Sequence, residues 1–186
     1  MPNFRGFIAI DIDPTERIRE FSEDLRRANA KLKMVEPKNL HVTLKFLGET
    51  REDIVDEIEK CMRNAVKDLK PFKIKLQGVG AFPNLKRINV IWIGTEGKEM
   101  EVIFRRLEDG LERLGYTKER RAFSPHLTIA RVKSLNDKEK LISILGKYSR
   151  EYFGEQIVES IKLKKSILTE KGPIYSTVKE VRMEEK

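Results

Sequence analysis

The only two histidines of the 186-residue chain, His41 and His126, stand in the same pattern of histidine, apolar residue, threonine and apolar residue. The first copy spans residues 41–44 (HVTL), and the second spans residues 126–129 (HLTI), 85 positions further along. Residues i and i+2 of a strand project from the same face, so each copy presents one imidazole beside one hydroxyl. The repeat therefore predicts two related strands whose histidines and threonines open on one cleft.

This set of side chains suits proton transfer around a phosphate group. An imidazole exchanges protons near neutral pH, and a threonine hydroxyl donates to a non-bridging phosphate oxygen. Displacement at phosphorus needs one group that takes a proton from the attacking oxygen and another that gives a proton to the leaving oxygen. Two histidines can divide these tasks, each contributing roughly 10²–10⁴ in rate. We therefore expect His41 and His126 to act on a phosphate held by Thr43 and Thr128, and a strained 2′,3′-cyclic phosphate on RNA fits this chemistry.

A two-histidine metal site is the competing functional interpretation of the same residues. Catalytic zinc sites use at least three protein ligands. The chain has no third histidine, and neither motif histidine has an Asp or Glu two residues later. We expect no metal and no other cofactor.

Two cations and two aromatic residues are further candidates for substrate contacts. Strand alternation puts Lys45 on the face of the first motif histidine, where it contacts phosphate or is a solvated strand charge. Arg131 has the opposite parity to its motif histidine and reaches the cleft only if a bulge or strand end redirects it. Phe123 and Tyr175, which we expect on loops, either stack on a base or plug the core.

Short strands and amphipathic helices mix along the chain without the regular alternation of a doubly wound fold, so we predict an α+β protein. The predicted strands cover residues 6–12, 40–47 (ended by Gly48), 72–82, 88–95, 126–132, 155–168 and 175–183. The predicted helices are one that begins after residue 14 and buries Ile18, Phe21 and Leu25, and others over residues 52–69, 97–114 and 137–148. No linker divides the chain, so residues 1–186 are expected to form one domain of two packed lobes.

Composition bounds the partner and the compartment. The formal net charge of +8 and the pI near 9.5 favour a polyanion such as nucleic acid, or describe a merely soluble basic surface. The single cysteine, Cys61, excludes an intramolecular disulfide and fits a reducing cytoplasm, with a buried thiol as its expected role. No apolar run is long enough to span a membrane. Abundant Lys and Glu with only two glutamines suit a protein adapted to high temperature.

Segments beyond the two motifs extend these observations into a family resemblance. The motifs resemble those of the two-histidine (2H) phosphoesterase superfamily, and specifically its RNA 2′,3′-cyclic phosphodiesterase branch, also called 2′-5′ RNA ligase. The similar segments cover nearly the whole chain: residues 5–10, 82–83, 87–94 and 124–131, together with Leu168, 172–173 and Tyr175 of a closing hairpin.

The resemblance implies two pseudo-symmetric lobes, each an antiparallel sheet backed by helices, with a central cleft. It implies metal-independent opening of cyclic phosphates to 2′-phosphates, with His41 and His126 as acid and base, Thr43 and Thr128 gripping phosphate, and Arg131 assisting. The expected partner is RNA with 2′,3′-cyclic phosphate ends, such as tRNA halves, bound by a cytoplasmic monomer. Two alternatives stay open: 2′-5′ ligation at the same site, and a non-catalytic basic RNA-binding module.

Overall fold

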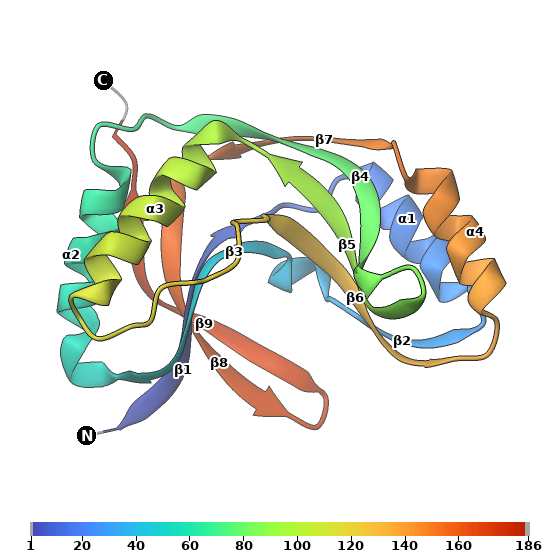
Figure 1. Ribbon diagram of the computed structural model, residues 1–186, viewed down its shortest axis with the longest axis horizontal. Coiled ribbons are helices and arrows are strands. Elements are labelled where there is room, and N and C mark those ends of the chain that lie inside the picture. Colours follow the sequence, from blue (N-terminus) through green and yellow to red (C-terminus); the bar gives the residue numbers. More distant parts are fainter. Residues whose placement is uncertain (1, 185–186) are drawn as a thin grey trace.

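The computed structural model describes residues 2–184, which form nine strands and four α-helices (Figure 1). The strands are β1 (Asn3–Asp11), β2 (Ala30–Met34), β3 (His41–Arg51), β4 (Phe72–Asn84), β5 (Arg87–Glu96), β6 (His126–Leu135), β7 (Tyr152–Val158), β8 (Ser160–Thr169) and β9 (Gly172–Arg182). The α-helices are α1 (Glu16–Arg26), α2 (Val55–Val66), α3 (Lys98–Glu112) and α4 (Lys138–Tyr148). The Thr15 hydroxyl accepts from the first turn of α1 and the Asp137 carboxylate does so for α4, which fixes where these helices begin.

The nine strands form one curled sheet, and every strand pairing within the described residues is antiparallel. The order is β7-β4-β5-β6-β3-β1-β8-β9, and β2 pairs with β6 outside this path. The sheet has two halves that meet where β3 pairs with β6, and this junction is the single pair Val42 and Leu127. The predicted α+β class and the antiparallel sheets are confirmed.

Two of the four helices pack on the half of the sheet that does not contain the strand preceding them. Helix α1 follows β1 in the chain but packs with α4 beside β4 and β7, whereas α3 follows β5 and packs with α2 beside β3 and β9 (Figure 1). Each half of the sheet is therefore covered by one helix from the first half of the sequence and one from the second half. The predicted inward face of the first helix is confirmed, since Ile18, Phe21 and Leu25 are buried.

Two predicted strand boundaries are wrong, and one strand was not predicted. The predicted strand over residues 155–168 is two strands, because the chain breaks at Glu159 and sends β7 to β4 but β8 to β1. Strand β2 was not predicted, since its five residues are too few to show a clear pattern. Gly48 does not end its strand: it takes a left-handed φ of 67° beside a bulge, and β3 continues to Arg51.

Candidate active site

The two motif strands are neighbours at the centre of the sheet. Val42 of β3 pairs with Leu127 of β6, and both side chains are fully buried in the core. In this antiparallel register, residue 41 stands across from residue 128, and residue 43 across from residue 126. Their side chains project from the face opposite Val42 and Leu127, and all four are half-buried there. The structure therefore brings both histidines and both threonines together on one open face.

Each histidine ring is held by the carbonyl two residues before it. The Nδ1 of His41 lies 2.7 Å from the Asn39 carbonyl oxygen, and the Nδ1 of His126 lies 2.9 Å from that of Ser124. A carbonyl oxygen only accepts, so Nδ1 carries the hydrogen in both rings and donates it. This leaves Nε2 as the nitrogen that can accept or release a proton. The two rings thus have the same orientation device and the same free nitrogen.

Aromatic side chains pack beside both rings. His41 lies against Phe7 and Tyr175, with ring centroids 5.1 and 5.4 Å away. His126 lies against Phe82 at 4.8 Å and Trp92 at 6.4 Å. Such contacts restrict the rotation of the imidazoles and keep each ring aimed at the open face.

The two aromatic candidates from the sequence have different environments. Tyr175 lies in β9 rather than on a loop and packs edge-on against His41. Phe123 is on the loop before β6 and stacks on Phe104 of α3 at 4.4 Å, with the rings nearly parallel. Phe123 therefore fixes this loop to the helix layer, whereas Tyr175 belongs to the surroundings of the histidine.

Each motif ends in a bulge at its fourth residue. In the β1–β3 ladder Ile8 pairs with Lys45 but Ala9 with Thr43, so Leu44 is an extra residue. In the β5–β6 ladder the pairing shifts in the same way, and Ile129 is the extra residue. A bulge reverses the alternation of faces downstream. Residues 44 and 45 are consequently both buried, as are residues 129 and 130.

The bulge in β6 turns Arg131 to the face that carries His126 and Thr128. Its side chain is exposed, and its strand position pairs with Lys33 of β2. Sequence alternation alone put Arg131 on the other face. The bulge redirects Arg131 to the cleft, as the sequence analysis required. A role for Arg131 in substrate binding stays a prediction.

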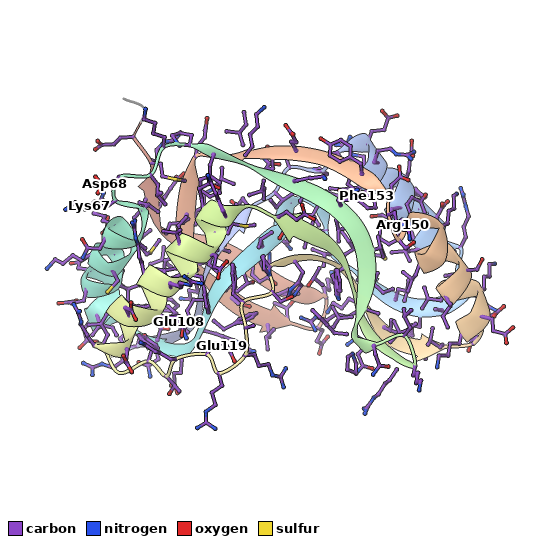
Figure 2. All side chains as sticks on the ribbon, turned by 45° about the horizontal axis from the view of Figure 1, so that its top comes forward. Lys67, Asp68, Glu108, Glu119, Arg150 and Phe153 are labelled. Carbon is purple, nitrogen blue, oxygen red and sulfur yellow. The ribbon has the colours of Figure 1, made fainter. Side chains whose placement is uncertain are left out.

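The equivalent bulge in β3 overturns the prediction for Lys45. Its side chain is only 8% exposed, with Nζ 2.6 Å from Glu108 Oε1 of α3 and 2.8 Å from the Thr117 carbonyl oxygen to which it donates. The other Glu108 oxygen accepts from the backbone N–H of Glu119 at 2.7 Å, and Figure 2 shows these two glutamates side by side. Lys45 therefore faces away from His41 and ties α3 and the loop before β6 to the first motif strand.

The same bulge exposes a residue that sequence reasoning missed. Phe46 lies five positions after His41, as Arg131 lies five positions after His126, and its side chain is 72% exposed. It pairs with Phe7, which packs against His41, so Phe46 is on the open face. The matched spacing was visible in the sequence, but nothing there marked the bulge that brings Phe46 to this face.

The LigT-like phosphoesterase model matches the chain twice, over residues 8–92 and 93–175, and each match contains one histidine motif. The chain belongs to the LigT-like phosphoesterase family. An RNA 2′,3′-cyclic phosphodiesterase from Methanocaldococcus jannaschii is 44% identical, covering 95% of this chain and 99% of its own. One from Archaeoglobus fulgidus is 40% identical, with 94% and 98% covered. A crystal structure of a Thermus thermophilus protein superposes with a TM-score of 0.80 at 28% identity, covering 96% of this chain and 97% of that one.

The two halves of this LigT-like phosphoesterase are similar, but a cluster of charged residues lies beside His41. Asp11 is the β1 partner of His41, and it binds Lys162 at 2.7 Å and the buried Lys164. Burial lowers the pKa of His41, and the positive charges of Lys164 and His126 act in the same direction. The hydrogen bond to Asn39 and the charge of Asp11 oppose this pKa shift. Sequence reasoning missed this cluster because β8 was not expected beside the first motif.

Three further findings concern other classes of site. Within residues 2–184, no group of three or more His, Cys, Asp or Glu side chains is placed to hold a metal ion. Burial raises the pKa of the Cys61 thiol, which makes this cysteine a poor nucleophile. None of the helices in the described part of the chain is long and apolar enough to cross a membrane.

Proposed function

We propose that this protein is an RNA 2′,3′-cyclic phosphodiesterase, which hydrolyses terminal 2′,3′-cyclic phosphates to 2′-phosphates. The observation that carries the proposal is the register of β3 and β6, which sets His41 across from Thr128 and Thr43 across from His126. Relatives 36–44% identical over nearly the whole chain carry the name of this activity, which supports the same conclusion.

In the proposed reaction, Thr43 and Thr128 donate hydrogen bonds to the non-bridging oxygens of the cyclic phosphate. The neutral histidine takes a proton from water at Nε2 as the water oxygen bonds to phosphorus. The bond between phosphorus and O3′ breaks on the opposite side, and O3′ takes the proton from Nε2 of the other, protonated histidine. The products are a 2′-phosphate and a free 3′-hydroxyl. The carbonyls of Asn39 and Ser124 keep both Nε2 atoms available throughout.

The residues after each bulge suit the rest of a terminal nucleotide. Phe46 offers an exposed ring on which a base can stack, and Arg131 offers a guanidinium to phosphate or to a base plane. We include both in the substrate-binding surface, together with the two threonines, and remove Lys45 from it. The exchanged helices support a single domain over residues 1–186, and we propose that it acts as a cytoplasmic monomer on RNA ends such as tRNA halves.

The deciding experiment incubates the pure protein with an RNA that ends in a 2′,3′-cyclic phosphate and maps the phosphate of the product. We expect a 2′-phosphate, with full activity after exhaustive chelation of divalent ions. A linear product joined to an added 5′-hydroxyl RNA as the main outcome would make the ligase the better description. RNA binding without turnover would replace the enzyme with a binding module.

A further inference from the structure

A basic pocket lies beside the turn between β4 and β5, at the far end of β6 from the histidine. It has a volume of about 290 Å³, and four cations line it: Lys86, Arg87, Lys133 and Lys138. The other lining residues are uncharged: Ile88, Asn89, Val132, Ser134 and Leu135. The pocket therefore presents positive charge from three chain segments with no carboxylate among its lining residues.

The four cations are not used by the fold as ion-pair partners. Across residues 2–184, none of them lies within 4.0 Å of a carboxylate oxygen, although many other surface lysines and arginines do. The Nζ of Lys138 contacts the Lys86 carbonyl oxygen, and the Asn84 side chain accepts from the backbone N–H groups of residues 86 and 87. The turn is thus ordered, and its side-chain charges stay available to an anion.

The pocket and the candidate active site lie at opposite ends of β6, which contributes residues to both. Val132 packs against the core, so its neighbours Arg131 and Lys133 project from the opposite, open face, where both are exposed. Lys33 of β2 pairs with Arg131 and adds a further cation beside it. From Thr128 to Lys133 the strand advances roughly 16 Å. These cations therefore lie between the phosphate clamp and the pocket, along β6 and the neighbouring strand β2, which Figure 1 shows side by side.

The other half of the molecule has no such row of cations. The positions 85 residues earlier, which match Arg131, Lys133, Ser134 and Lys138, hold Phe46, Gly48, Glu49 and Asp53. Both carboxylates at the β3 end have a cation beside them, because Arg5 of β1 stands across from Glu49 and Arg51 pairs with Asp53. The cations at the β6 end have no such partner. A polyanion that occupies the clamp is therefore attracted more strongly toward the end of β6.

We propose that this pocket binds a backbone phosphate of the RNA strand whose 3′ end lies in the active site. The inference rests on the proposed function and adds the path of the single strand: along β6 and β2, past Arg131 and Lys33, to the β4–β5 turn. Unpaired cations on that path release condensed counterions from the RNA, which gives affinity without sequence readout.

The test compares two substrates in one double variant, Arg87→Gln with Lys133→Gln. We expect KM for a single-stranded RNA ending in a 2′,3′-cyclic phosphate to rise about tenfold or more, whereas the ratio of kcat to KM for a nucleoside 2′,3′-cyclic phosphate changes less than about twofold. The slope of log affinity against log salt should become shallower by about 0.7, because the contact to one phosphate of a single strand is lost.

The matched control is Lys60→Gln with Lys98→Gln, which removes the same charge from exposed positions on α2 and α3. It should change neither KM nor the salt slope. Equal effects of the two double variants, or equal effects on both substrates, would overturn the proposed path. Binding of the same RNA to His126→Ala, with and without the pocket substitutions, measures the contribution of the pocket without turnover. A failure of the phosphodiesterase assignment would be seen separately, because the unaltered protein would then hydrolyse neither substrate.

Discussion

In β3 the residue after the bulge that faces the cleft is Phe46, and in β6 it is Arg131. Up to that point the strands match: both begin with a histidine anchored to the carbonyl two residues earlier, and both carry a threonine two residues on. In the proposed function, the shared part surrounds a phosphate from two equivalent sides. The part that differs would meet the rest of the RNA, which has no such symmetry. The repeated motif thus accounts for the proposed chemistry, and the difference between Phe46 and Arg131 accounts for a preferred direction of RNA binding.

The largest expected effect comes from the part that the two halves share. His41→Ala and His126→Ala should each lower kcat for RNA 2′,3′-cyclic phosphate hydrolysis by at least about 10², because each removes one proton-transfer partner. The double variant should be little worse than either single variant, since the two groups act as a unit. Near-full activity in either single variant, with folding checked by circular dichroism, would remove that histidine from the mechanism.

A second prediction compares Lys45 and Arg131. Strand alternation put Lys45 on the open face and Arg131 on the core face, and the structure has the reverse. Lys45→Met should lower the free energy of unfolding by about 3–5 kcal/mol, because it leaves Glu108 buried without its counter-charge. For a chain of this size that corresponds to a Tm roughly 6–20 °C lower. The exposed Arg131→Met should change the free energy of unfolding by no more than about 0.5 kcal/mol.

The control for this ion pair removes both charges at once. Lys45→Met with Glu108→Leu should recover much of the lost stability, because neither side chain is then an unpaired buried charge. Thermal unfolding of the three variants measures the difference. A double variant less stable than Lys45→Met would show that the pair contributes through other contacts.

These cases show how far the sequence reaches. The paired motifs predicted a shared face for His41 and His126, and the alternation of apolar residues predicted the strands that carry them. Alternation could not predict the bulges, because the pairing of β3 with β1 and of β6 with β5 sets them, and no glycine or proline stands at Leu44 or Ile129. The break at Glu159 could not be predicted for a similar reason. The alternation of polar and apolar residues continues through it, and only pairing with different strands separates β7 from β8.

The two threonines should give a smaller and equal pair of effects. Thr43→Val and Thr128→Val each delete one hydrogen bond to a charged phosphate, which is worth about 1.5–3 kcal/mol, and leave both histidines in place. We expect kcat/KM to fall roughly tenfold to a hundredfold in each. Serine at either position retains the hydroxyl and should restore most of the activity. A clearly unequal pair would show that the clamp is less symmetric than the register of β3 and β6 suggests.

The smallest expected effect concerns the charges that distinguish the surroundings of His41. Burial is the main cause that lowers the pKa of this imidazole, and the Lys164 ammonium adds to it. Lys164→Met removes a positive charge that disfavours the imidazolium, so the pKa of His41 should rise. In an NMR titration, the His41 ring signals should therefore change at higher pH than in the unaltered protein, whereas Lys164→Arg keeps the charge and should leave them in place.

The dependence of activity on pH then shows whether His41 acts as the base or as the acid. Only one limb of the bell-shaped profile belongs to His41, and that limb should move to higher pH in Lys164→Met. Movement of the low-pH limb identifies His41 as the base, because a base must be deprotonated to act; movement of the high-pH limb identifies it as the acid. Movement of either limb toward lower pH would contradict the sign of the Lys164 effect. The asymmetry in charge between the two halves would then have to act on His126, the other histidine of the pair.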